Sequence, residues 1–157
     1  VRDALASAGL EPAALTLELT EDLQVVADET AVDDRLTALA ALGVRLSIDD
    51  FGTGNASLSY LRRFAITELK IDRSYVLGLG APGERPQLVR GLMDLGRAVG
   101  LHIVAEGIED QRQLRSLLEM GCEFGQGFLL GRPRPARSTT DVLQRWVNVD
   151  AEVNARA

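Results

Sequence analysis

The chain has 157 residues, 25% of them charged and 46% hydrophobic, a balance that excludes a disordered or fibrous protein and favours one globular domain. Its formal net charge of −6 argues against general binding to a nucleic-acid polymer, which needs clustered Lys and Arg. One cysteine, Cys122, and one histidine, His102, exclude an internal disulfide and a metal site built from several Cys or His, so we expect any metal to be held by oxygen.

The first half of the chain repeats one pattern, in which an amphipathic stretch ends in Gly and a short β-branched run follows. Glycine ends a helix at little steric cost, and a short apolar run is typical of a strand buried on both faces. In chain order, the pattern predicts a helix over 4–8 ending at Gly9, a strand over 15–20, a helix over 32–39 ending at Gly43, a strand over 44–50, a helix over 57–64 and a strand over 68–72.

The same pattern continues in the second half. It predicts a surface loop over 77–84, a helix over 88–99 ending at Gly100, a strand over 101–106, a helix over 114–118 ending at Gly121, a strand over 122–128 and a last helix over 138–146. The alternation of strands and helices requires a parallel sheet with right-handed crossovers. Two α/β architectures remain open at this point, a doubly wound sheet and a closed barrel.

Each predicted strand ends in acidic, amide or amine side chains. Because the carboxyl ends of parallel strands face the binding site, we expect these side chains to converge. They are Glu18, Glu21, Asp49, Asp50, Lys70, Asp72, Glu106, Glu109 and Gln126.

Most of these residues, taken singly, have an ordinary structural explanation. Asp49-Asp50 is typical of a strand end followed by a helix cap, and His102 and Cys122 are interpreted as packed residues and not as ligands. Lys70 is less ordinary, because a strand buried on both faces admits a lysine only beside a carboxylate.

Several carboxylates on one rim repel one another unless cations lie between them, and oxygen ligands favour Mg²⁺ or Mn²⁺. Adjacent aspartates suit a pair of ions about 3.5–4 Å apart, an arrangement used in phosphodiester hydrolysis. A lysine beside them would stabilise charge in the transition state. The residues alone therefore favour a metal-dependent phosphoesterase, with an enolase-like lyase as the alternative.

Five motifs resemble, in order and spacing, those of the EAL-domain family. They are Glu18-Leu19-Thr20-Glu21, Asp49-Asp50-Phe51-Gly52-Thr53-Gly54, Leu69-Lys70-Ile71-Asp72, Ala105-Glu106-Gly107-Ile108-Glu109 and Gln126-Gly127-Phe128. The family comprises bacterial phosphodiesterases that open cyclic di-GMP to linear pGpG on a TIM-like (β/α) barrel. The resemblance runs from about Leu5 to Trp146, so we expect residues 1–147 to be the C-terminal portion of such a domain and 148–157 to be a frayed polar tail.

The resemblance also implies roles for single residues. The implied metal ligands are Glu18, Asp49, Asp50 and Glu106. Lys70 resembles the lysine that contacts the catalytic water, Gln126 the glutamine near that water, and Glu106 either a ligand or the group that activates it.

Three further acids resemble supporting residues. Glu21 corresponds to the glutamate that holds the loop after Asp49-Asp50, which the family uses to couple dimerisation to metal binding. Asp72 and Glu109 correspond to residues that support the metal ligands from behind.

Length indicates that the barrel is incomplete. A complete barrel has about 250 residues, so about five of its eight strand–helix units would occupy roughly 156. The chain also begins with Val1 and not with Met, and we expect it to be a piece of a longer protein. The Glu-Ala-Leu segment that names the family, with its metal-ligand Glu and an Arg, is expected upstream, as is a metal-binding Asn.

The expected function is therefore two-metal hydrolysis of cyclic di-GMP by the parent domain, with the active site incomplete in this chain. The resemblance implies two Mg²⁺ or Mn²⁺ ions, a homodimer formed through the loop after Asp50 and a cytoplasmic location, with any membrane anchor upstream. The alternatives are a non-catalytic cyclic di-GMP receptor or protein-interaction module, and a truncated chain without function. The ligand positions present all keep competent side chains, which favours the enzyme.

Overall fold

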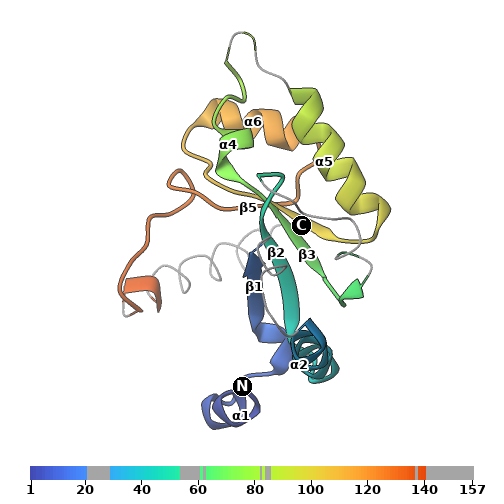
Figure 1. The fold of residues 1–157 in the computed structure, drawn as a ribbon. Helices are drawn as coiled ribbons and strands as arrows, with labels where there is room; N and C mark the ends of the chain where they lie inside the picture. The colour runs from blue at the N-terminus through green and yellow to red at the C-terminus, as the bar shows by residue number, and fades with distance from the viewer. Residues whose placement is uncertain are drawn as a thin grey trace, which may run out of the picture.

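The computed structural model describes residues 1–20, 29–53, 61, 63–81, 83, 86–136 and 138–140. Helices and strands alternate along these residues (Figure 1). The elements are α1 (Arg2–Ala8), the 3-10 helix η1 (Pro12–Ala14), β1 (Thr16–Thr20), α2 (Glu29–Ala41), β2 (Arg45–Phe51), β3 (Glu68–Ile71), α4 (Arg73–Val76), α5 (Pro86–Ala98), β4 (His102–Ala105), α6 (Gln111–Glu119) and β5 (Phe124–Gly125).

The strands form one parallel sheet of five in the order β1-β2-β3-β4-β5. Each strand pairs with the next one in the sequence, so the described sheet winds in one direction, as a barrel does. It lacks the reversal of strand order that marks a doubly wound sheet. The predicted α/β class with parallel strands is confirmed, and the open choice between the two architectures falls to the barrel type.

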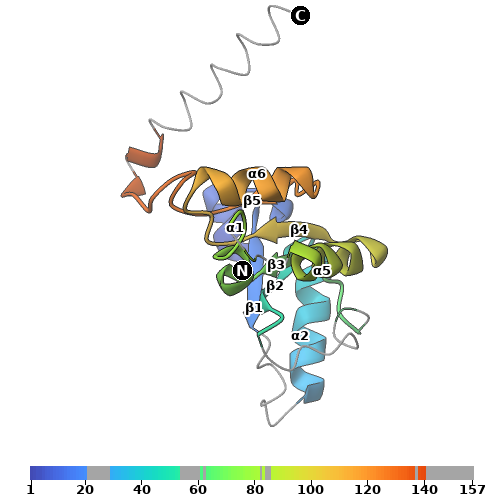
Figure 2. The ribbon, with the colours of Figure 1, turned by 90° about the horizontal axis from the view of Figure 1, so that it is seen from above.

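The helices α2 and α5 cover one face of the sheet, where α2 contacts β2 and α5 contacts β3 and β4 (Figure 2). Leu46, Leu69 and Ile71 from the strands are fully buried there, as is Met93 from α5. Gly96 allows α5 to lie close to β4, because a Cβ at this position would overlap the side chain of Ile103. The apolar face is therefore a packed support, and the strand ends carry the polar residues.

Several predicted elements differ from those in the structure. The last strand is shorter than the predicted 122–128 and covers only Phe124–Gly125; beyond it, Gly127 packs directly on the backbone of Ile108. The short helices α4 and η1 were not predicted. The predicted helices over 57–64 and 138–146 lie mostly outside the described residues, and the tail over 148–157 lies wholly outside them.

The two residues interpreted as packed have different environments. Cys122 is buried as expected, and burial raises the pKa of its thiol. His102 lies in a strand, as expected, but it is exposed and not packed in the core. Its ring meets the exposed ring of Phe124 edge-on, with the centroids 5.6 Å apart.

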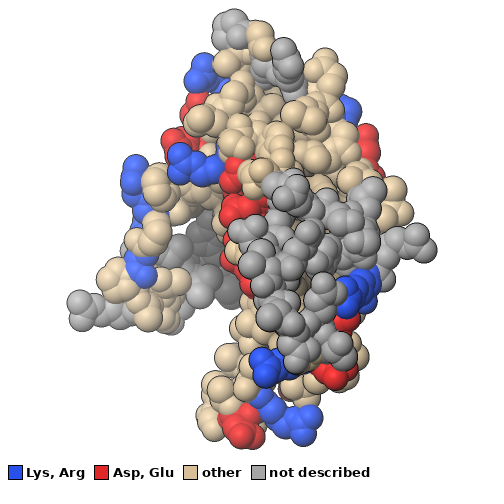
Figure 3. Space-filling view, in the orientation of Figure 1, with Lys and Arg blue, Asp and Glu red and all other residues tan. Residues whose placement is uncertain are grey.

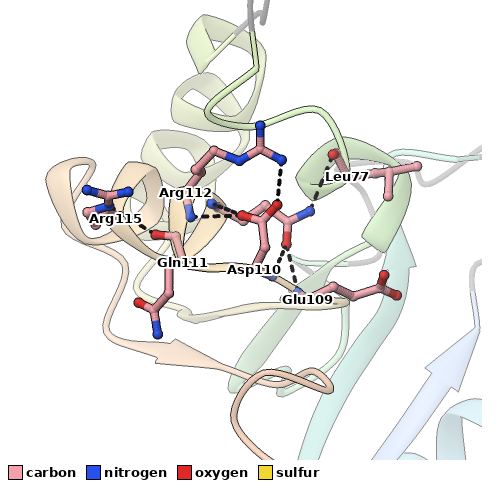
Figure 4. A network of polar contacts seen from close by, with 7 residues as sticks. Leu77, Glu109, Asp110, Gln111, Arg112 and Arg115 are labelled. Carbon is pink, nitrogen blue, oxygen red and sulfur yellow. Dashed lines mark hydrogen bonds and ion pairs between the residues drawn. The ribbon is translucent and has the colours of Figure 1, made fainter.

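The junction between β4 and α6 is held by a capping box (Figure 4). The Asp110 side chain accepts hydrogen bonds from the backbone N–H groups of Arg112 and Gln113, at 2.8 and 3.0 Å. The Gln113 side chain is buried, and its Oε1 accepts from the backbone N–H groups of Glu109 and Asp110 at 2.7 and 3.0 Å. Its Nε2 donates to the carbonyl of Leu77 at 3.3 Å, so Gln113 ties the segment after β4 to the turn after α4.

Among the described residues, no helix combines the length and the apolar character that crossing a bilayer requires.

The Gln113 contacts predict a marked loss of stability in Gln113→Ala, because three backbone groups would lose their partner. We expect the free energy of unfolding to fall by about 2 kcal/mol, measured by urea denaturation. Gln111→Ala is the matched control, since Gln111 is exposed on the same helical turn and is not one of the two residues of the capping box. Equal losses in the two variants would contradict this account of the junction.

The charge of Asp110 predicts an acid-dependent stability. The hydrogen bond from Arg112, with those from the backbone of Gln113 and Arg112, holds the pKa of Asp110 at about 2. A lowered pKa in the folded state stabilises the protein above the unfolded pKa of about 3.9, and the effect is lost as the pH falls toward 2. We expect the urea midpoint to fall less between pH 5 and pH 2.5 in Asp110→Asn, which keeps the cap without the charge, than in the wild type. Identical pH profiles would refute this role.

Candidate active site

Lys70 lies at the centre of the polar strand ends. Its side chain is only 5% exposed, and its ammonium contacts three carboxylates. The Nζ atom lies 2.7 Å from Glu18 Oε1, 2.9 Å from Asp49 Oδ1 and 2.6 Å from Glu106 Oε1. A buried lysine was expected to need one carboxylate partner, and Lys70 has three.

These residues come from separate strands of the sheet. Glu18 lies in β1, Asp49 in β2, Lys70 in β3, and Glu106 directly after β4. The predicted convergence of these strand ends is confirmed. Figure 3 shows acidic side chains gathered near the carboxyl ends of β1 and β2, with basic side chains beside them.

The surrounding acids decide the protonation state of Lys70. Burial alone would lower its pKa, but hydrogen bonds to Glu106, Glu18 and Asp49 raise it well above the ordinary value. Lys70 is therefore a permanent cation at neutral pH, and it is not available as a proton acceptor.

Asp49, Asp50 and Glu106 form a group that fits a metal ion. Each offers a carboxylate oxygen, and these oxygens lie within 4.8 Å of one another. Burial raises the pKa of Asp50, and the neighbouring charges of Asp49 and Asp72 raise it further, although Lys70 opposes the shift. An all-oxygen set with surplus negative charge is the donor set that Mg²⁺, Mn²⁺ and Ca²⁺ prefer.

Glu106 has a further partner in Gln126, which follows β5. The Gln126 Nε2 donates to Glu106 Oε1 at 2.6 Å, the same oxygen that contacts Lys70. Burial raises the pKa of Glu106, although Lys70 opposes this shift. Glu106 thus joins the acidic group to the last strand of the sheet.

Among the described residues, the others predicted for the site are not part of the group formed by Asp49, Asp50 and Glu106. Glu18 contacts Lys70 but is not one of the three acids that gather together. Asp72 is the N-cap of α4 and accepts from the Ser74 N–H at 2.9 Å, which lowers its pKa although burial opposes this. Glu109 is exposed, and Glu21 lies outside the described residues.

A cavity of about 610 Å³ opens beside Glu106 and Gln126. Its lining includes Glu109, Arg73, Phe128 and the Arg132 side chain, whose guanidinium lies 4.4 Å from the centroid of the Phe128 ring. Sequence reasoning missed these arginines. The signal for Arg132 and Arg134 was the basic, proline-containing run 131–135, which is separated from the last motif by two residues.

Comparison with known proteins agrees with this geometry. The family model of the EAL domain matches residues 1–133. The chain is 47% identical over 136 residues to the bifunctional diguanylate cyclase/cyclic di-GMP phosphodiesterase MucR of Pseudomonas aeruginosa, covering 87% of this chain and 20% of that protein. It therefore spans about a fifth of the length of this curated relative.

Solved structures give the same result. The EAL domain of Mycobacterium smegmatis DcpA matches with a TM-score of 0.84 and 39% identity, over 91% of this chain and 64% of that one. The MucR phosphodiesterase in complex with c-di-GMP matches with a TM-score of 0.77 and 45% identity, over 88% and 56%. Klebsiella pneumoniae BlrP1 in its manganese/cy-diGMP complex matches with a TM-score of 0.73 and 34% identity, over 83% and 33%.

EAL domains are TIM-like (β/α) barrels, and the five parallel strands described above correspond to part of such a barrel. With the family model matched over residues 1–133, the chain belongs to the EAL-domain family.

Proposed function

We propose that this chain supplies part of the active site of a metal-dependent phosphodiesterase that opens cyclic di-GMP to linear pGpG. The observation that carries the proposal is the gathering of Asp49, Asp50 and Glu106 beside the buried ammonium of Lys70. The c-di-GMP complexes of MucR and BlrP1, both similar to this chain, support the choice of substrate.

In this reaction the oxygen of water bonds to phosphorus and the bond from phosphorus to the 3′ oxygen breaks. The proton lost by water ends on that 3′ oxygen, so the product carries a 5′ phosphate. Divalent cations held by the carboxylates would supply Lewis-acid stabilisation of the phosphate and of the attacking oxygen.

The side chains of this chain divide the remaining work. Lys70 stays protonated, so it orients the attacking water and stabilises negative charge on the phosphate oxygens. Glu106 is a candidate metal ligand and also the candidate acceptor of the water proton. Its pKa is raised toward neutral pH, which makes its carboxylate a better base. Gln126 fixes the orientation of the Glu106 carboxylate through their hydrogen bond.

The cavity beside Glu106 is suited to the nucleotide. Its volume of about 610 Å³ lies within the range of small-molecule sites, and Arg73, Arg132 and Arg134 line it. Guanidinium groups bind phosphate oxygens, and the exposed Phe128 offers an apolar ring face to a base.

Finer features of the proposal follow from the family resemblance. We propose two ions, Mg²⁺ or Mn²⁺, with Glu18 as a further ligand, Asp72 and Glu109 as supports and Glu21 as the residue that holds the loop after Asp50. A homodimer through that loop and a cytoplasmic setting complete the proposal. The manganese and calcium complexes of BlrP1 support a divalent cation in general.

The function is tested by incubating the chain in excess over cyclic di-GMP with Mn²⁺ or Mg²⁺ and following pGpG by chromatography. We expect slow pGpG release, because the chain supplies only part of the active site. The release should require the metal and fall at least about 100-fold in Glu106→Gln, since the amide neither accepts a proton nor carries charge. Glu119→Gln, an exposed helix position, is the matched control. Tight binding of cyclic di-GMP without metal and without hydrolysis would overturn the proposal in favour of a receptor.

The charge balance predicts that a divalent cation can replace Lys70 in stabilising the fold. Lys70→Met keeps the length of the side chain but leaves three carboxylates without their cation, so we expect the free energy of unfolding to fall by about 3 kcal/mol. Millimolar Mn²⁺ should recover part of this loss in urea denaturation, and it should stabilise the variant more than the wild type. A variant as stable as the wild type, or one that Mn²⁺ does not stabilise, would contradict the assigned role of Lys70.

A further inference from the structure

The turn at Asp50 is what brings two neighbouring carboxylates to one side. Successive side chains of a regular strand point to opposite faces, so Asp49 and Asp50 would be separated. Instead, Asp50 has a φ of 54°, the one positive φ outside glycine among the described residues. The pairing of β2 with β3 is also irregular between Ile48 and Phe51. Both carboxylates therefore reach Glu106.

Such a backbone conformation is unfavourable for aspartate and persists only when its surroundings hold it. Two sets of contacts do so. Within the turn, the backbone N–H and the hydroxyl of Thr53 donate to the Asp50 carbonyl, at 3.3 and 2.9 Å. From outside the turn, the hydroxyl of Tyr75 donates to the carbonyl of Gly52.

The ring of Tyr75 also fits closely against Gly52. A Cβ at residue 52 would lie 2.8 Å from Tyr75 Cε2, and Gly52 itself has a φ of 100°. The Tyr75 ring therefore packs against the turn at Gly52, in addition to the hydrogen bond from its hydroxyl.

Tyr75 lies in α4, which directly follows the strand that carries Lys70. Asp72 caps this helix by accepting from the Ser74 N–H at 2.9 Å. The cap fixes the helix relative to β3. Tyr75 then connects the helix to Gly52 in the Asp50 turn, 23 residues earlier in the sequence.

We propose that Tyr75 is a positioning residue, which sets the Asp50 turn so that Asp49 and Asp50 face the same metal-binding space. It acts through the Gly52 carbonyl, which accepts a hydrogen bond from the Tyr75 hydroxyl. The inference rests on the proposed function in taking the carboxylates as metal ligands. That Tyr75 holds the Asp50 turn in place is a separate structural claim.

Tyr75→Phe tests the inference, because it keeps the ring and removes the hydroxyl. Thr67→Val is the matched control, since the Thr67 hydroxyl donates to the Leu46 carbonyl at 3.1 Å at the other end of the same two strands. Two readouts are needed, the hydrogen exchange of the Thr53 amide by NMR and the Kd for Mn²⁺ by calorimetry. The urea midpoint of each variant gives the accompanying loss of stability.

We expect Tyr75→Phe to accelerate Thr53 exchange and to raise the Mn²⁺ Kd, each by about 10-fold, in the range seen when supports of metal ligands are removed. Thr67→Val should leave both within about twofold, even where it loses as much stability. Unchanged Thr53 exchange, an unchanged Kd, or equal weakening in Thr67→Val would each overturn the inference. A wild type that binds no Mn²⁺ overturns the proposed function, and Thr53 exchange then still decides whether Tyr75 holds the turn.

Discussion

One buried ammonium group holds the polar end of this sheet together. Parallel strands deliver their last side chains to the same edge, and here several of those side chains are acids that repel one another. Lys70 compensates three of them at once, from Glu18, Asp49 and Glu106. One positive charge does not balance the group, because Asp50 also lies beside Asp49 and Glu106. The group therefore keeps an excess of negative charge, which the divalent cation proposed above would balance.

The two faces of the sheet have different parts in this arrangement. The face under the helices is apolar and closely packed, with Leu46, Leu69 and Ile71 fully buried. Packing of this kind fixes the strands relative to one another, and so fixes the distances among the side chains at their ends. Local exceptions then adjust the site, above all the turn at Asp50, where the alternation of the strand is broken.

Much of the fold was predictable because its signals are local. Glycine after an amphipathic stretch marked the ends of α1 and α2, and alternation of helices with short apolar runs indicated a parallel sheet. The convergence of Glu18, Asp49, Lys70 and Glu106 followed from the rule that parallel strands end at the same edge. What was missed depends on contacts between distant segments. The helix α4 has too few residues to show a periodicity, nothing in an Asp-Asp pair signals a positive φ, and Gln113 reads as a surface residue although it is buried.

The most direct test of this account is the position of a bound cation. Crystals of the chain soaked in Mn²⁺ and measured at the manganese absorption edge locate the ion by its anomalous scattering. The account predicts an anomalous peak within coordination distance, about 2.2 Å, of carboxylate oxygens from Asp49, Asp50 and Glu106. The account would be contradicted by an anomalous map without a peak there at saturating Mn²⁺, in a structure where Lys70 still forms its ion pairs with the three carboxylates.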